Sequence, residues 1–228
     1  MSLPKESYMV VDVPALPSDL MSEFEHLPLD KYGLGPYRTI RLSQYMMHFD
    51  NGSWHLALLP KRGFVQSGAV NSLRGGVLRE REQLRIDPTV LVDFIAKQIP
   101  IDPVLIHHVN VNQVRVRSNA EVNGISVAEG PHRDGHEFGA VVVSARHNVS
   151  GGETQLMPLG GGEPFFRTIL EPNQAVVYED PKMWHYATDI EHLTPEGGYR
   201  DLWILAFNRW DHRKYGPSHE QRAMAAAA

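Results

Sequence analysis

The chain has 228 residues, of which 42% are hydrophobic and 21% charged, as is typical of globular proteins. Its net charge of −5 and its lack of a lysine- or arginine-rich run argue against nucleic acid as a partner. No apolar run is long enough to cross a bilayer and the first residues do not resemble a signal peptide, so we expect a cytoplasmic protein without a membrane partner. The absence of cysteine excludes disulfides, thiolate metal sites and cysteine nucleophiles, whereas twelve histidines are compatible with a metal site.

The first hundred residues predict a mixture of strands and helices. β-Branched and aromatic runs favour strands, whereas a capping residue followed by apolar residues at helical spacing favours a helix. These criteria give strands over 8–13, 37–48 and 53–59, and helices over 18–25 and 87–95. Asp50-Asn51-Gly52 predicts a tight hairpin turn. Residues 61–82 have no clear periodicity, and we expect a loop. Its glycine-rich part over 61–81 is either a lid over a site or a disordered segment without function.

From Val104 onward the pattern is that of an all-β fold. Turn residues separate apolar segments at intervals of roughly eight to twelve residues, which is typical of a sandwich or barrel. The expected strands cover 104–117, 138–145, 154–157, 165–170, 175–178, 184–190 and 203–207. No linker interrupts the chain, so we predict a single domain over 1–228 with a core at about 104–210. The N-terminal helices and strands should pack outside that core, and the alanine-rich 223–228 looks like a frayed end.

His132 and Asp134 are separated by one residue. On an extended strand, side chains at positions i and i+2 point to the same face, which places an imidazole beside a carboxylate. With one further histidine, this pair would complete a two-histidine, one-carboxylate set, which is diagnostic of non-haem Fe(II) oxygenases. The alternative interpretation is a solvated loop in which the pair has no function.

His185 is our candidate for the third ligand. About four short strands separate it from Asp134, which is what returns a chain to a neighbouring strand in a double-sheet jelly roll. The alternative is a histidine packed in the core among aromatic residues. Three other histidines, His136, His147 and His192, lack a strand context that directs them at the pair, and we expect them at the surface.

Arg200 begins an otherwise apolar strand, where an unpaired guanidinium is costly to bury. One interpretation is an ion pair with a carboxylate such as Asp201 or Glu179. The other is a bidentate clamp on a dicarboxylate ligand, for which the planar guanidinium is well suited.

Taken together, these motifs resemble the Fe(II)/2-oxoglutarate-dependent dioxygenases, which have a double-stranded β-helix (jelly-roll, cupin-like) fold. Four segments are similar, more narrowly, to the bacterial L-isoleucine 4-hydroxylase-like subgroup, whose members hydroxylate free aliphatic amino acids. The segments are Gln113-Val114-Arg115, Pro131-His132-Arg133-Asp134, Trp184-His185-Tyr186-Ala187 and Tyr199-Arg200-Asp201-Leu202. One departure is Leu202, because many members of the wider superfamily have serine or threonine at this position to help hold 2-oxoglutarate.

The resemblance implies that His132, Asp134 and His185 hold Fe(II) and that Arg200 meets the far carboxylate of 2-oxoglutarate. It also implies a hydroxylase that consumes 2-oxoglutarate and O2 and releases succinate, CO2 and a hydroxyamino acid. The carboxylate at Asp134 argues against the halogenating relatives, which leave that position open for chloride.

A free amino acid also needs a cation for its carboxylate and an anion or carbonyl for its ammonium group. Gln113 and Arg115 share one face of the strand over 104–117, and Arg115 is our preferred anchor for the carboxylate. Glu129 is the candidate partner of the ammonium group. A solvated polar face of an edge strand is the alternative for the first two. Two other functional classes stay open at this point: a dioxygenase of peptide or protein side chains, and a non-catalytic cupin-like domain that binds a metal or small ligand.

Overall fold

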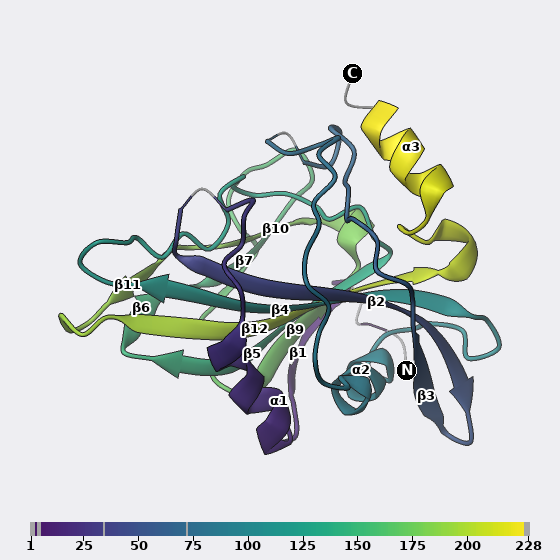
Figure 1. Cartoon of the computed structure of the whole chain (residues 1–228), viewed down its shortest axis with the longest axis horizontal. Helices are drawn as coiled ribbons and strands as arrows, with labels where there is room; N and C mark the ends of the chain where they lie inside the picture. The colour runs from purple at the N-terminus through teal and green to yellow at the C-terminus, as the bar shows by residue number, and fades with distance from the viewer. Residues whose placement is uncertain (1–2, 4–5, 34, 72, 226–228) are drawn as a thin grey trace.

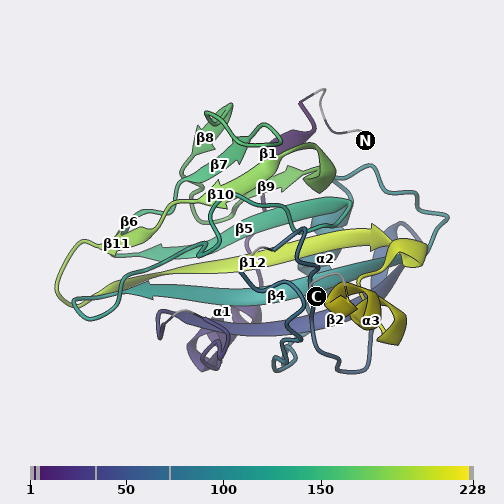
Figure 2. The ribbon, with the colours of Figure 1, turned by 90° about the horizontal axis from the view of Figure 1, so that it is seen from above.

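A seven-stranded antiparallel sheet forms the centre of the computed structural model, which describes residues 3, 6–33, 35–71 and 73–225 (Figure 1). Its strand order is β1-β9-β5-β12-β4-β2-β3. In that order the strands are Tyr8–Asp12, Gln174–Tyr178, Phe138–His147, Gly198–Arg209, His107–Ser118, Arg38–Asp50 and Ser53–Leu58. Figure 2 shows the long central strands side by side.

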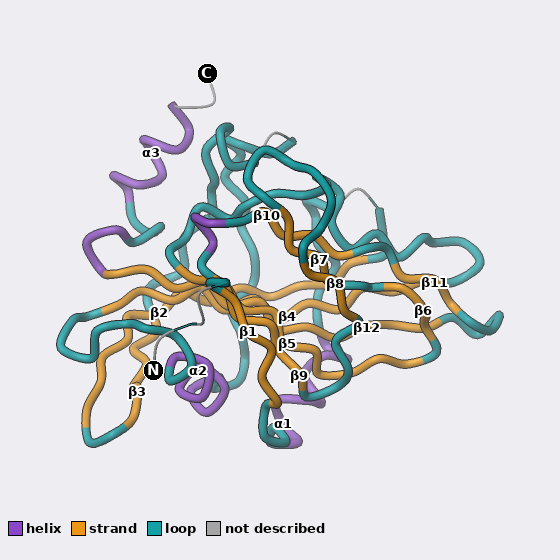
Figure 3. The backbone as a smooth tube through the Cα atoms, turned by 180° about the vertical axis from the view of Figure 1, so that it is seen from behind, coloured by secondary structure: helices purple, strands orange, loops and turns teal. Residues whose placement is uncertain are grey.

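Two small antiparallel sheets accompany the main one. Their orders are β10-β7-β8 and β11-β6, and their strands are Trp184–Ala187, Thr154–Met157, Phe166–Thr168, Ile190–His192 and Val149–Gly151. The first of them packs over the main sheet, since Leu156 of β7 shares a buried cluster with Val143, Val176 and Leu202. The predicted mainly β, jelly-roll fold is therefore confirmed (Figure 3).

From the sequence we expected the N-terminal strands to pack outside the core. In the structure they are instead part of the main sheet. β1 pairs with β9 through Tyr8↔Tyr178 to Asp12↔Gln174, and β2 pairs with β4 along ten residues. These pairings join segments far apart in the chain, which local patterns do not reveal. The predicted hairpin turn forms between β2 and β3, where Asn51 and Gly52 both have positive φ, 47° and 81°. That combination is the reason for an Asn-Gly pair in a two-residue turn.

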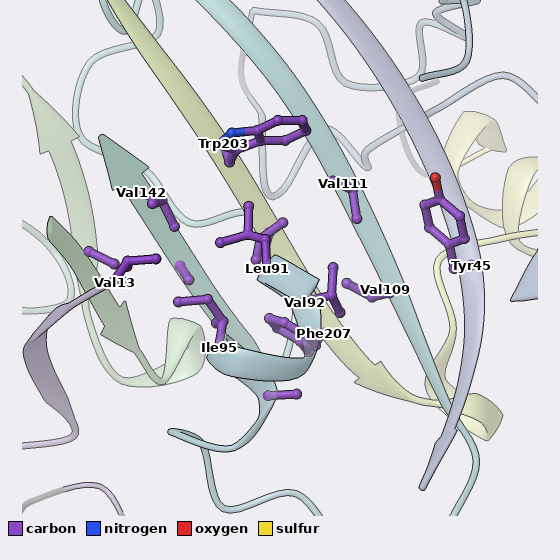
Figure 4. Close-up of a cluster of buried hydrophobic side chains, with 14 of the residues drawn as sticks. Val13, Tyr45, Leu91, Val92, Ile95, Val109, Val111, Val142, Trp203 and Phe207 are labelled. Carbon is purple, nitrogen blue, oxygen red and sulfur yellow. The ribbon is translucent and has the colours of Figure 1, made fainter. Parts of the chain in front are cut away.

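Two helices cover one face of the main sheet. α1 (Ser18–Ser22) continues into a 3₁₀ turn (Glu23–His26), and α2 is Thr89–Ala96. Figure 4 shows Leu91 and Ile95 of α2 packed among side chains of the central strands, including Trp203. Val90 of the same helix is exposed. The burial of this face leaves the opposite face of the sheet available for a site.

A third helix, α3 (Pro217–Ala225), was not predicted, because residues 223–228 read as a frayed end. It forms because Arg62 of the loop makes a bidentate ion pair with Glu220, at 2.6 and 2.7 Å, and because Ala223 is buried. Residues 226–228 lie outside the described part of the chain. Within the described residues, no helix has both the length and the apolar character that a membrane span requires.

Candidate active site

Three side chains converge on the face of the sheet opposite the helices. His132 Nε2 lies 3.5 Å from Asp134 Oδ1, and His185 Nε2 lies 3.6 Å from Asp134 Oδ2. One potential ligand atom from each residue lies within 4.8 Å of the other two. The structure thus brings together the three residues that the sequence singled out, from a loop and from strand β10.

The backbone explains why the two histidines meet. His132 and His185 form an isolated antiparallel bridge, in which each backbone N–H donates to the other's carbonyl at 3.1 and 2.9 Å. The spacing of His132 and Asp134 suggested a regular strand, but the pair lies in a loop before β5. The side chains of His132 and Asp134 still point in the same direction, because the bridge at His132 holds the local backbone as a strand would.

A buried carboxylate that the sequence analysis missed holds this loop. Asp180 is 1% exposed and accepts hydrogen bonds from the backbone N–H groups of Asp134, Gly135 and His136, at 2.8, 2.8 and 3.1 Å. Its Oδ1 also lies 3.5 Å from His185 Nε2. Asp180 therefore fixes the loop that carries two of the predicted ligands, His132 and Asp134, and contacts the third, His185. Asp180 is 46 residues from Asp134, so no local motif in the sequence could have indicated its role.

The hydrogen bonds and the protonation of the cluster favour the binding of a metal cation. His132 Nδ1 donates to the carbonyl of Gly130 at 2.9 Å, an arrangement that leaves Nε2 free to face Asp134. Burial opposes ionisation of Asp134, but the hydrogen bond with His132 and the charges of both histidines outweigh it and lower its pKa. Burial likewise disfavours the charged form of His132, yet Asp134 raises the pKa of His132 to about 9. A metal ion would take the place of this proton.

The residues fit a first-row metal ion. His185 Nε2 is buried, and no residue in the described ranges hydrogen-bonds to it. Ligand atoms about 2.1 Å from a shared metal are about 3 Å apart at right angles, close to the separations seen here. Two imidazoles and one carboxylate on one side of an ion leave its other positions open.

The cluster opens into a cavity of about 160 Å³ between the main sheet and the β10-β7-β8 sheet. The main sheet contributes alternate side chains of its central strands to the lining, which are Asn110, Asn112, Val141, Val176, Tyr178, Leu202, Ile204 and Ala206. Thr154 and Leu156 of β7 line the other side. The mixture of apolar walls and a few polar groups is typical of a small-molecule site.

Arg200 lies in this cavity lining. It is 1% exposed, and its Nε and Nη2 atoms have no hydrogen-bond partner among the described residues. Burial and then the charge of Arg146 lower the pKa of Arg200 to about 9, so the guanidinium is still protonated at neutral pH. The ion pairs that we had considered do not form, because Asp201 pairs with Arg115 and Glu179 with Lys182. A buried, unpartnered cation calls for an anionic ligand.

Two of the three expected substrate residues lie on the wrong face of the sheet for the cavity. Arg115 forms a bidentate ion pair with Asp201, at 2.6 and 2.8 Å, and stacks on Tyr199. Gln113 is fully buried and its side chain donates to the carbonyl of Leu20 at the α1 side. Neither is among the described residues that line the cavity. This placement speaks against Arg115 and Gln113 as substrate anchors.

Glu129, the third expected substrate residue, does line the cavity, and the loop over 61–82 lies beside it. Asn71 Nδ2 donates to Glu129 Oε1 at 3.2 Å and to Gln66 Oε1 at 3.1 Å. The same Gln66 oxygen accepts from Arg79 Nη2 at 2.6 Å, while Gln66 Nε2 lies 3.4 Å from Asp134 Oδ1. The loop therefore connects the predicted ligand Asp134 to one acidic and one basic side chain in the cavity.

The other three histidines, which we expected at the surface, differ in their exposure to solvent. His147 is exposed, as expected, and His192 is partly buried beside Ser118. His136 is only 5% exposed, which corrects our expectation of a surface position. Its Nδ1 accepts from Asn208 Nδ2 at 2.7 Å, and burial lowers its pKa. It follows the ligand loop directly and contributes to the lining of the cavity.

Comparisons with known proteins agree with this site. The 2OG-Fe dioxygenase family model matches residues 21–206, and the chain therefore belongs to this family. A BsmA homologue from Methylobium petroleophilum PM1 is 25% identical, with a TM-score of 0.72 over 90% of this chain and 89% of that one. IDO from Bacillus thuringiensis is 16% identical, with a TM-score of 0.71 over 89% and 94%. The Fe(II)/(alpha)ketoglutarate-dependent dioxygenase TqaL is 14% identical, with a TM-score of 0.60 over 89% and 82%. Comparison with curated protein sequences finds no significant match.

The protein is thus a 2-oxoglutarate-dependent non-haem iron dioxygenase, with Fe(II) as cofactor and 2-oxoglutarate and O2 as cosubstrates. The predicted class of enzyme is confirmed.

Proposed function

We propose that the protein hydroxylates a free, aliphatic amino acid, as do the L-isoleucine 4-hydroxylase-like enzymes that its motifs resemble. The observation that carries this proposal is a single cavity that holds the His132–Asp134–His185 cluster, the unpartnered cation Arg200, and a separate acidic and basic pair, Glu129 and Arg79. A zwitterionic substrate needs one group of each sign in addition to those that hold the metal and the cosubstrate.

His132, Asp134 and His185 would hold Fe(II), and Arg200 would bind the far carboxylate of 2-oxoglutarate. Bound Fe(II) and 2-oxoglutarate supply the O2-dependent chemistry that hydroxylates a C–H bond, with release of succinate and CO2. The chain itself orients the ligands through Gly130 and Asp180, and it excludes water with the apolar walls of the cavity.

The substrate end of the cavity is formed by the loop over 61–82 and by residues 126–129. Arg79 is 6% exposed and its Nε has no hydrogen-bond partner within the described part of the chain. Its Nη2 is held by Gln66, and its guanidinium lies 4.9 Å from the ring centroid of Phe64. These contacts fix the guanidinium and leave part of it available for a carboxylate. Glu129, with Oε1 held by Asn71, suits the ammonium group.

Changing Arg79 to alanine tests the substrate assignment. We expect the KM for the amino acid to rise about 10- to 100-fold, because a charge-assisted hydrogen bond to the carboxylate is lost. Glu129→Gln should raise it through the loss of the ammonium partner. The measurement is amino-acid-dependent succinate formation, with each of the twenty amino acids in turn.

The matched control is Arg85→Ala, in the segment after the loop, where the side chain is 61% exposed and, among the described residues, pairs only with Glu82 at 3.7 Å. This variant should keep the wild-type KM. An Arg79→Ala enzyme with unchanged KM would remove Arg79 from the substrate site. A response to peptides alone would replace the free amino acid by a peptide side chain.

A further inference from the structure

A second arginine lies beside Arg200 on the neighbouring strand. Arg146 of β5 is the direct cross-strand partner of Arg200 of β12, and directly opposed residues present their side chains on the same face. A register irregularity between Asp201 and Leu202 creates this pair, since Leu202 opposes Val143 whereas Asp201 opposes Ala145. Without the extra residue in β5, Arg146 would point to the helix side. The bulge therefore turns Arg146 toward the cosubstrate face, as bulges beside active sites commonly do.

Neither guanidinium is fully hydrogen-bonded by the residues that the structure describes. Arg146 Nη2 donates to the carbonyl of Gly151 at 2.8 Å, but its Nη1 is buried without a partner among the described residues. The Nε and Nη2 atoms of Arg200 are in the same situation. Like charges directly opposed on neighbouring strands destabilise a sheet, and the cost is greater here because Arg200 is buried. An anion between the two arginines would satisfy both.

The backbone of Gly152 packs closely against both arginines. A Cβ at this position would lie 3.2 Å from Arg146 Nη1 and 3.2 Å from Arg200 Cδ, with Ile190 Cγ2 at 3.0 Å. Any side chain would therefore press against both arginines. Its φ of +67° also favours glycine over other residues. Leu202, the next residue on the Arg200 face, has no polar side-chain atom to offer a ligand.

We propose that Arg146 and Arg200 together bind the far carboxylate of 2-oxoglutarate, one from each of two neighbouring strands. The proposal rests on the cosubstrate role of Arg200 proposed above and adds a second cation to it. Many members of the wider superfamily have a serine or threonine hydroxyl at the position of Leu202. In this chain Arg146 takes the place of that hydroxyl as the second group that binds the carboxylate. The carboxylate cancels the repulsion between the two guanidinium groups, so binding of the cosubstrate also stabilises this end of the sheet.

The test is the affinity of Arg146→Met for two ligands, measured by calorimetric titration of the Mn(II)-loaded protein without oxygen. The first ligand is 2-oxoglutarate, and the second is 2-oxopentanoate, which has the same chain length but no far carboxylate. We expect about 10- to 100-fold weaker binding of 2-oxoglutarate and unchanged binding of 2-oxopentanoate. The metal-loaded protein without 2-oxo acid should melt at a higher temperature than wild type, because the repulsion is removed.

Arg167→Met is the control, because Arg167 is half-exposed and its one ion pair within the described part of the chain is with the exposed Glu163. Arg146→Lys keeps the charge and should lose less affinity than Arg146→Met, which distinguishes binding from damage to the fold. Affinity for 2-oxoglutarate within about twofold of wild type, or an equal loss for both ligands, would overturn the proposal. A wild-type protein that does not bind 2-oxoglutarate would instead contradict the cosubstrate assignment of Arg200 itself.

Discussion

Replacing Asp134 by alanine is expected to abolish both metal binding and the conversion of 2-oxoglutarate to succinate. The substitution removes the carboxylate of the cluster and leaves two neutral histidines, so the site loses its one negatively charged ligand for Fe(II). We expect a loss of metal affinity well above the roughly 10- to 100-fold typical of residues behind the ligands. Titration with Fe(II) without oxygen, followed by a succinate assay, measures both effects.

The neighbouring Arg133→Ala is the matched control for this variant. Arg133 lies in the same loop, and its only side-chain hydrogen bond within the described residues is a long one, 3.5 Å, to the carbonyl of Pro181. It should bind metal and turn over 2-oxoglutarate like the wild type. Full turnover by the Asp134→Ala variant would remove Asp134 from the metal site.

Replacing Asp180 by alanine should have the largest effect on stability. The carboxylate accepts three backbone N–H groups in a buried position, and its removal leaves all three donors without a partner. Each buried unpaired donor costs about 1–3 kcal/mol, so the free energy of unfolding should fall by at least about 3 kcal/mol. Metal affinity should fall about 10- to 100-fold, because the loop that holds Asp134 loses its anchor. Urea unfolding and metal titration measure the two effects.

Glu179→Ala provides the comparison for Asp180. Glu179 is adjacent in the chain but pairs with the half-exposed Lys182 at 2.7 Å, and such a pair contributes about 0–1 kcal/mol. Its loss should leave both unfolding and metal binding close to wild type. An Asp180→Ala protein as stable as Glu179→Ala would show that the three hydrogen bonds do not hold the loop.

The sequence was informative where a residue's role depends on its chemistry. His132, Asp134, His185 and Arg200 were singled out by residue type and spacing, and the structure places all four on one cavity. Many of the strands and helices were also predictable, since turns such as Asn51-Gly52 and apolar alternation are local signals.

The choice between the faces of a strand was not predictable. In β4 the odd-numbered Val109 and Val111 are buried against the helices, whereas the even-numbered Val114 and Val116 are buried on the cavity side. Both faces of the strand are covered, so its apolar pattern does not say which face holds the site. Arg115 was assigned to the substrate for this reason, although it lies on the helix side.

Residues whose role depends on distant pairing were missed for a different reason. Arg146 reaches the cosubstrate side through a bulge in β5, and Asp180 meets the ligand loop only through the fold. Gln66 and Arg79 belong to a loop without periodicity, so its contacts with Asp134 and Glu129 could not be read from the sequence. These four positions needed the three-dimensional arrangement.

The central claim is that this dioxygenase acts on a free amino acid. The most direct measurement incubates the Fe(II)-loaded protein with 2-oxoglutarate, O2 and each amino acid, and quantifies succinate together with the mass of the amino acid. The account predicts that one or more aliphatic amino acids gain a single oxygen atom in equal amount to the succinate formed. Succinate formation that no free amino acid stimulates, with every amino acid recovered unchanged, would contradict it.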